Sequence, residues 1–151
     1  MYFGEGSLNV AISDDLISWQ PLVDNKGEPI SVLQVRPGRY DSELVEAGPP
    51  ALLTKDGIVL LYNGKNSAVW GDKTIAPGAY SAGQVLFDTN NPTQLLARTE
   101  NCFFKPETPY ETKGQYQGGT VFIQGLVRFH GQWFLYYGGA DSIVGVAVTK
   151  E

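Results

Sequence analysis

The sequence predicts an all-β fold built from short antiparallel strands. Its apolar residues alternate with polar ones or form short runs, and neither pattern has the 3.6-residue period of an amphipathic helix. The runs are rich in β-branched and aromatic residues, which suit a pleated, half-buried surface. Glycine makes up 18 of the 151 residues and, with proline, divides the runs into segments of strand length. We expect one all-β unit over residues 1–151, without a second domain.

The order of strands and turns follows from these runs. Asp56-Gly57 separates two apolar runs and predicts a hairpin turn, and His130-Gly131 predicts a second one. The segment Ser13–Trp19 comes nearest to a helix, because Ser13 would cap a single turn. The predicted strands are 8–12, 58–62, 120–129, 133–137 and 143–148. Further loops are expected at Gly27, Pro37-Gly38, Pro77-Gly78, Asn91-Pro92 and Gly118-Gly119.

A weak internal repeat relates three parts of the chain. The segments 2–4, 61–64 and 135–138 each end an apolar strand on aromatic residues and a glycine, and a second short apolar strand follows each. A spacing of about 60 to 75 residues with several strands per unit is typical of β-propeller blades, although a β-sandwich has similar turn spacing. About two to three blades cannot close a ring, since propellers need about four to eight. The chain is therefore part of a longer protein, assembles with copies of itself, or is not a propeller.

Composition narrows the classes of partner and site. The net charge of −5 argues against nucleic acid or an anionic membrane as partner, and no apolar run has the length of a membrane span. The N-terminus lacks the basic and apolar regions of a signal peptide, so we expect a cytoplasmic or periplasmic location without choosing between them. One cysteine, Cys102, and one histidine, His130, argue against a disulfide framework, a cysteine-based zinc site and a Ser-His-Asp triad.

The densest group of charged residues lies in the segment 35–50, between turn signals and before a predicted strand. Loops at strand ends often carry binding and catalytic residues. Glu46 is of special interest, because the stiff sequence Gly48-Pro49-Pro50 follows shortly after it and would fix its direction. The alternative is that these charges are solvated and pair with one another.

Two further polar segments are candidates for ligand binding. The segment 106–114 contains Tyr110, two prolines and several carboxylates, and it forms either a rigid rim around a polar ligand or an ordinary surface loop. Asp141 lies between two apolar strands, where it would receive ligand hydroxyls or stabilise the connection as an Asx turn. The 3 Trp, 8 Tyr and 7 Phe suit stacking on sugar rings, although most aromatic residues of a β protein belong to its core.

Three groups of residues resemble motifs of glycoside hydrolase family 130, and they occur in the family's order. Residues 1–19 resemble its "YWGE…A.SDDLI.W" strand pair. Residues 44–64 resemble its "G-P-P…LLYxG" segment. Residues 121–147 resemble its C-terminal "VF..GLV…YYGAAD..VGLA" signature, which is the most specific of the three.

The resemblance implies a five-bladed β-propeller that acts on β-mannosides, of which this chain would be the C-terminal part with about two to three blades. The family contains inverting phosphorylases and inverting hydrolases. Its general-acid aspartate lies in an earlier blade and has no counterpart in this sequence. The resemblance therefore implies that the chain alone is catalytically incomplete, and that an N-terminal propeller half or further copies of the chain would complete the ring.

Departures from the family's phosphorylase pattern indicate the hydrolase branch. Phosphorylases typically carry a lysine and a glycine where this chain has Leu44 and Glu46, and a histidine where it has Asn63. Losing the lysine and the histidine removes groups that hold phosphate, and a carboxylate there would repel a dianion. A carboxylate suits instead a general base that activates water in inverting hydrolysis. The chain thus looks like the β-1,2-mannosidase-type branch.

The expected function is hydrolysis of β-mannosides in glycans with inversion, on a mannose-containing oligosaccharide. Glu46 is the expected general base, and Glu43 is the second candidate for that role. Asp141 is expected to bind mannose hydroxyls, by resemblance to the aspartate of the family's "AAD" motif. No metal or cofactor is expected, because two carboxylates supply acid and base. The other expected substrate-binding residues are Arg36, Asp41, Tyr110 and Gln124.

Three alternatives remain open at this point. A mannoside phosphorylase would need phosphate for turnover. A non-catalytic propeller fragment would bind sugar without turning it over. A structural role, in which copies of the chain complete a ring, would show as self-association, because unpaired strand edges and exposed sheet faces aggregate unless they are covered.

Overall fold

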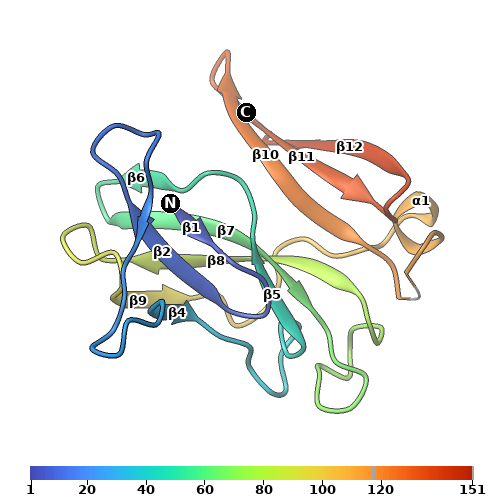
Figure 1. Ribbon diagram of the computed structural model, residues 1–151. Helices are drawn as coiled ribbons and strands as arrows, with labels where there is room; N and C mark the ends of the chain where they lie inside the picture. Colours follow the sequence, from blue (N-terminus) through green and yellow to red (C-terminus); the bar gives the residue numbers. More distant parts are fainter. Residues whose placement is uncertain (117, 151) are drawn as a thin grey trace.

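The computed structural model describes residues 1–116 and 118–150 and contains three antiparallel β-sheets (Figure 1). The N-terminal sheet consists of β1 (Tyr2–Phe3), β2 (Leu8–Ile12), β3 (Gln20–Pro21) and β4 (Ser31–Leu33). The central sheet consists of β5 (Leu44–Ala47), β6 (Leu52–Thr54), β7 (Gly57–Lys65), β8 (Tyr80–Phe87) and β9 (Leu95–Arg98). The C-terminal sheet consists of β10 (Val121–Phe129), β11 (Gln132–Gly139) and β12 (Ile143–Val148).

The predicted all-β fold is confirmed, and the pairing follows the internal repeat. Each strand that ends on aromatic residues and glycine pairs antiparallel with the next strand of the repeat: β1 with β2, β7 with β8, and β11 with β12. The one helix in the described residues is α1 (Pro109–Thr112). No helix in this part of the chain is long and apolar enough to cross a membrane.

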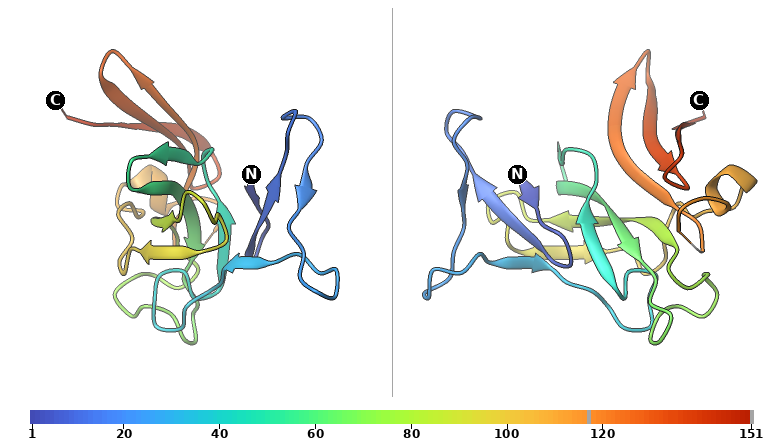
Figure 2. Two further views of the ribbon diagram at one scale, coloured as in Figure 1. Left: turned by 90° about the vertical axis from the view of Figure 1, so that its left-hand side faces the viewer. Right: turned by 45° about the vertical axis from the view of Figure 1, so that its right-hand side comes forward.

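The central sheet lies between the other two, which occupy different sides of it (Figure 2). Successive side chains of a strand point to opposite faces, so Tyr62 of β7 faces the N-terminal sheet, whereas Leu61 faces the C-terminal sheet. The first core contains Leu8, Val10, Val32, Leu33, Tyr40, Val45, Leu60, Tyr62, Val85 and Phe87. The second core contains Ala82, Val121, Ile123, Leu135 and Tyr137. The central sheet therefore has one hydrophobic core on each of its two faces.

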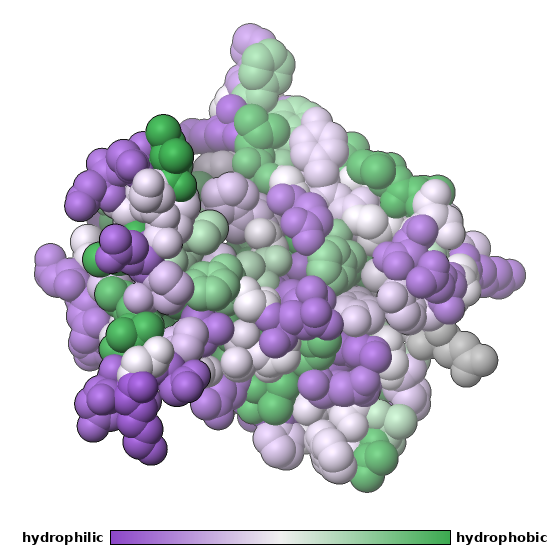
Figure 3. All heavy atoms as spheres, viewed as in Figure 1, coloured by the Kyte–Doolittle hydropathy of each residue, from purple (hydrophilic) through white to green (hydrophobic). Residues whose placement is uncertain are grey.

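The outer face of the C-terminal sheet is apolar and uncovered in this chain. In the register of the sheet, Tyr136 lies beside Val146 and Phe134 lies between Val127 and Val148. The exposed apolar residues of this sheet include Val127, Phe129, Tyr136, Val144, Val146 and Val148. Figure 3 shows apolar side chains at the surface over the β10–β11 hairpin, at the top of the view.

Turn chemistry explains where the predicted elements hold and where they differ. His130 and Gly131 have φ angles of 47° and 85°, as a two-residue turn with both central residues at positive φ requires, so this hairpin turn is confirmed. The first hairpin turn is shifted by one residue: Thr54 pairs with Gly57, and the turn is Lys55-Asp56.

The short helix of this chain does not form in the segment that comes nearest to a helix in the sequence. The segment Ser13–Trp19 forms no helix: the Ser13 hydroxyl accepts a hydrogen bond from the Leu16 backbone N–H at 2.8 Å, but Leu16 has a φ of 62°, which stops the helix from continuing. The segment 106–114 contains α1, where only a loop was expected. The Glu111 carboxylate accepts a hydrogen bond from the Thr108 N–H at 2.9 Å in its first turn, and Pro109 begins the helix.

A side-chain amide joins the central and C-terminal sheets. Asn63 of β7 is fully buried; its Nδ2 donates to the Ile123 carbonyl at 3.0 Å, and its Oδ1 accepts from the Ile123 N–H at 2.8 Å. The amide therefore satisfies both backbone groups of one β10 residue, much as a neighbouring strand would.

Replacing Asn63 with alanine is expected to lower the free energy of unfolding by about 2 kcal/mol, because both backbone groups of Ile123 lose their partner in a buried place. Urea denaturation followed by tryptophan fluorescence measures the change. The matched control is Asn90→Ala on an exposed turn, which is expected to change stability by less than about 0.5 kcal/mol. Equal stability of the two variants would contradict the structural role of the amide.

Candidate functional site

Glu46 lies on β5, on the face of the central sheet that is turned toward the C-terminal sheet. It is half-buried and stands opposite Asn63 in the register, and Asn63 in turn stands opposite Ala82 of the second core. β5 and β6 pair with successive parts of β7, and the segment 48–51 interrupts them. The predicted stiff connector thus follows directly after the strand that carries Glu46.

A second carboxylate, which the sequence analysis did not predict as a site residue, lies beside Glu46. Glu5 follows β1 and forms an isolated antiparallel bridge with Glu46, which joins the N-terminal and central sheets. Gly4 and Gly6 on either side of Glu5 have φ angles of 121° and 81°, so the chain turns sharply there. The one signal in the sequence was the position of Glu5 within the segment 1–19, which carries the first family motif.

The two carboxylates act on one another electrostatically. Burial raises the pKa of Glu46 above its usual range, and the negative charge of Glu5 raises it further. A carboxylate with a raised pKa holds a proton more readily, which is the property of a stronger general base.

Tyr80 lies near this pair and packs against two further aromatic side chains. The ring of Tyr80 on β8 lies 5.6 Å from that of Phe122 on β10 and 5.6 Å from that of Tyr116, between ring centroids. Burial, followed by the negative charge of Glu46, raises the pKa of Tyr80 to about 12. The Tyr80 hydroxyl therefore keeps its proton at neutral pH.

Glu43, the second candidate base, is held in an ion pair. Its Oε1 lies 2.8 Å from Nζ of Lys65, and the two side chains are 42% and 24% exposed. The Lys65 ammonium also lies over the ring of Tyr80, 5.7 Å from its centroid. The structure thus brings Glu43 and Glu46 to the same end of the central sheet, but in different electrostatic surroundings.

Arg36 and Asp41 are separated from Glu46 by the central sheet. Asp41 is fully buried and accepts hydrogen bonds from Arg36 Nη2 at 2.8 Å and from the Tyr62 hydroxyl at 2.7 Å, and Arg98 donates to it as well. Tyr62 faces the N-terminal sheet, whereas Glu46 faces the C-terminal sheet. The structure therefore does not bring Arg36 and Asp41 together with Glu46. These two residues pair with one another instead, as the alternative for this segment predicted.

Tyr110 and Asp141 lie at one end of the C-terminal sheet. Tyr110 belongs to α1 and is 49% exposed, and the loop after this helix bonds to the β11–β12 turn through Gln115 N–H and the Ala140 carbonyl. Asp141 is exposed in that turn, with a φ of 56°, and its carboxylate forms no hydrogen bond with any described residue. Its side chain is therefore free to meet a ligand, and the Asx-turn alternative lacks its hydrogen bond.

Gln124 occupies the bulge of β10, where the register with β11 shifts between Ile123 and Gly125. It lines a cleft of about 650 Å³ together with Met1, Tyr2, Ala47, Gly48, Pro49 and Trp19, among others. Ala47 directly follows Glu46 but points to the opposite face of β5. Gln124 therefore lies near β5 through the cleft that it shares with Ala47, whereas Tyr80 lies on the face of the central sheet that carries Glu46.

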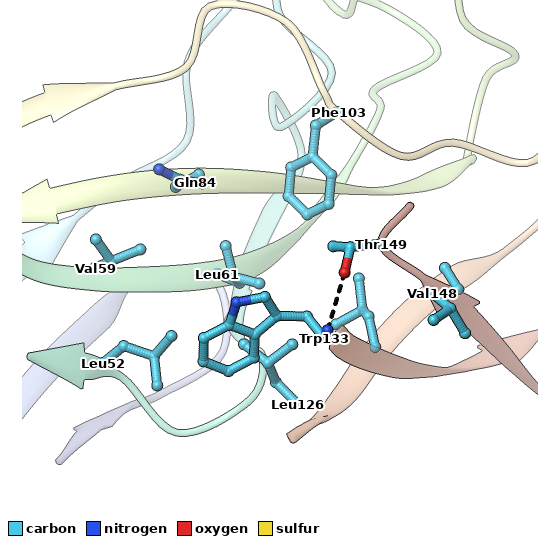
Figure 4. A pocket seen from close by; sticks show the side chains of 11 residues that line it. Leu52, Val59, Leu61, Gln84, Phe103, Leu126, Trp133, Val148 and Thr149 are labelled. Atoms are coloured by element: carbon cyan, nitrogen blue, oxygen red, sulfur yellow. Dashed lines mark hydrogen bonds between the residues drawn. The ribbon is translucent and has the colours of Figure 1, made fainter. Parts of the chain in front are cut away.

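A separate cleft of about 440 Å³ opens between the central and C-terminal sheets (Figure 4). Its wall is almost entirely apolar, with Trp133, Phe103, Leu61 and Leu126 among the side chains shown, and it contains none of the predicted site residues. Within residues 1–116 and 118–150, no three His, Cys, Asp or Glu side chains form a group that could hold a metal ion.

Comparisons with known proteins agree on one family. The family model Glyco_hydro_130, described as beta-1,4-mannooligosaccharide phosphorylase, matches residues 1–151. A 1,2-beta-oligomannan phosphorylase from Thermoanaerobacter sp. (strain X514) is 33% identical over 141 residues, which are 93% of this chain and 42% of that protein. The chain thus spans less than half the length of this curated relative.

Solved structures give a similar result. A structure described as belonging to glycoside hydrolases of this family that target beta-1,2 mannosidic linkages in Candida mannan is 50% identical, with a TM-score of 0.95 over 97% of this chain and 41% of that chain. The Beta-1,2-mannobiose phosphorylase from Listeria innocua is 30% identical, with a TM-score of 0.75 over 95% of this chain and 36% of that chain. These structural relatives are β-propeller-like.

Proposed function

Because the chain belongs to glycoside hydrolase family 130, we propose that it forms part of an inverting β-mannosidase in which Glu46 is the general base. The observation that carries this proposal is the carboxylate pair of Glu46 and Glu5 at the junction of two sheets. We further propose that the ring is a five-bladed propeller, completed by a part of the protein or by copies outside this chain.

In this mechanism, the Glu46 carboxylate takes a proton from a water molecule while the water oxygen attacks the anomeric carbon of a mannoside. The glycosidic bond breaks, and the departing oxygen receives a proton from a general acid that is not among the residues assigned here. Inverting enzymes hold acid and base about 6.5 to 9.5 Å apart, so that the water fits between them. The raised pKa of Glu46 suits the acceptor of this proton.

Three features support hydrolysis over phosphorolysis. Glu5 and Glu46 place like charges where a phosphate dianion would have to bind. The nearest cation described, Lys65, is already paired with Glu43. The amide of Asn63, at the position where phosphorylases carry histidine, is bonded through both its nitrogen and its oxygen to Ile123. Phosphorolysis is the second candidate, because the curated relatives are named as phosphorylases.

The proposed substrate is a β-1,2-linked mannose oligosaccharide, as the names of the relatives suggest. Asp141, Tyr110 and Gln124 are proposed to contact the sugar, since each is exposed on the C-terminal sheet or on the helix beside it, and the face of β5 that carries Glu46 is turned toward this sheet. For Arg36 and Asp41 we propose a structural role instead, and Glu43 is assigned a different role below.

The test measures products from β-1,2-mannobiose, with and without inorganic phosphate, for the completed ring that contains this chain. Hydrolysis is expected to release mannose at the same rate in both conditions, with no mannose 1-phosphate. Formation of mannose 1-phosphate would show phosphorolysis and overturn the proposal. Binding of the disaccharide without any turnover would instead identify the chain as a sugar-binding propeller fragment.

A further inference from the structure

Lys65 is the cation nearest to Glu46 in the strand register. Lys65 stands opposite Leu44 on β5, and Asn63 stands opposite Glu46, so Lys65 and Glu46 are diagonal neighbours on one face of the central sheet. Diagonal neighbours are about 7 to 8 Å apart, which is within reach of a long side chain. An unrestrained lysine in this position would be expected to pair with Glu46.

The structure shows a different arrangement. The Lys65 ammonium is bound to Glu43 at 2.8 Å and lies over the ring of Tyr80. Glu43 directly precedes β5 and is bonded to Lys65 through its backbone as well, since the Glu43 N–H donates to the Lys65 carbonyl at 2.9 Å. The carboxylate of Glu43 is therefore fixed beside Lys65 at both the backbone and the side chain.

We propose that Glu43 is a positioning residue that holds the Lys65 ammonium away from Glu46, so that the Glu46–Glu5 pair stays without a cation. This inference rests on the proposed role of Glu46 as base, and it assigns to Glu43 a part in the site without contact to the reacting atoms. The ring of Tyr80 supports the same position of Lys65 from β8.

The charges around Glu46 show why the position of Lys65 matters. Glu5 after β1 is the charged group that acts on Glu46. Tyr80 on β8 lies near Glu46, Glu5, Glu43 and Tyr116, and Lys65 on β7 is bound to Glu43. Burial and Glu5 raise the pKa of Glu46. A cation that moved to within about 4 to 6 Å would lower it by about one unit or more and would weaken the base.

The experiment measures the pKa of the Glu46 carboxyl by NMR titration of the whole chain labelled with ¹³C-glutamate, with Glu46→Gln used to assign the signal. Glu43→Gln is expected to lower this pKa by about one unit, because Lys65 is released. Glu43→Gln combined with Lys65→Met is expected to restore the raised value. Lys65→Met alone is expected to leave it unchanged.

Other results would overturn the proposal. An unchanged pKa in Glu43→Gln would show that Glu43 does not restrain Lys65. A lowered pKa of Glu46 that persists in the double variant would show that the charge of Glu43 acts on Glu46 directly and not through Lys65. A raised pKa of Glu46 in Lys65→Met would show that Lys65 already acts on Glu46 in the wild type. Glu100→Gln, which removes a carboxylate from the exposed pair with Arg39, is the matched control and is expected to change nothing.

The titration needs no substrate, so its outcome is independent of whether the chain hydrolyses mannosides. If mannose release is measured, its rise with pH is expected to move to lower pH in Glu43→Gln and back in the double variant. Loss of the Glu43–Lys65 pair is expected to cost less than about 1 kcal/mol of stability, because both side chains are partly exposed. The variants therefore remain folded for both measurements.

Discussion

Replacing Glu46 with glutamine is expected to lower phosphate-independent mannose release by about 100- to 10,000-fold, the usual contribution of a general base. Glutamine keeps the size of the side chain but cannot take a proton from water. Since Glu46 is half-buried and forms no ion pair among the described residues, the fold is expected to survive. Initial rates on β-1,2-mannobiose, measured at enzyme concentrations high enough to detect the residual rate, give the ratio.

The neighbouring carboxylate gives a second comparison for this prediction. Glu5→Gln removes a like charge, so the pKa of Glu46 is expected to fall and the pH dependence to move to lower pH, with a smaller loss of rate. Asp56→Asn, in the β6–β7 turn, is the remote control. Full activity of Glu46→Gln would remove Glu46 from the mechanism, and a larger loss in Glu5→Gln would make Glu5 the base.

Replacing Asp41 with alanine is expected to destabilise the chain by about 3 to 5 kcal/mol, as is usual when one partner of a buried ion pair is removed. The substitution leaves Arg36, Arg98 and the Tyr62 hydroxyl without their shared acceptor in the first core. Urea denaturation measures the loss, and the exposed Asp56→Ala serves as control with an expected change below about 0.5 kcal/mol.

A milder variant keeps the prediction testable if Asp41→Ala does not fold. Asp41→Asn retains one acceptor oxygen and is expected to fall between the wild type and Asp41→Ala in stability. A stability equal to wild type for Asp41→Asn, with sugar binding lost, would instead return Asp41 to the ligand-binding residues.

The strands were predictable because their signal is local. The alternation in 8–12 and 143–148 gave the bounds of β2 and β12, and the glycine after His130 gave a correct hairpin turn. The helix α1 was not predicted, because a helix of four residues is too short to show the periodic pattern of apolar residues that identifies helices. Its first turn is supported instead by the hydrogen bond from the Thr108 N–H to the Glu111 carboxylate.

The site was less predictable, because its contacts join distant parts of the chain. Glu46 was found from its motif, but its partner Glu5 meets it only when the N-terminal and central sheets pack together. Arg36 and Asp41 lie close to Glu46 in sequence, yet the alternation of β5 and β7 separates them onto the other face. A sequence with several charges in one loop is compatible with a ligand pocket and with a buried network of ion pairs. The burial of Asp41, which shows that the network is formed, is visible only in the structure.

The amide of Asn63 has a mechanical consequence for the pair of sheets that it joins. Its two bonds to Ile123 hold β10 against β7, and the bond from the Tyr80 N–H to the Gly119 carbonyl holds the start of β10 against β8. The apolar cleft lies along the other half of β7, at Val59 and Leu61, where the sheets are spread apart. The two sheets are therefore fastened at the end of β7 that carries Asn63 and separated by the cleft along its other half. Glu46, opposite Asn63 in the register, stands at the fastened end, where polar bonds between the sheets fix the backbone around it.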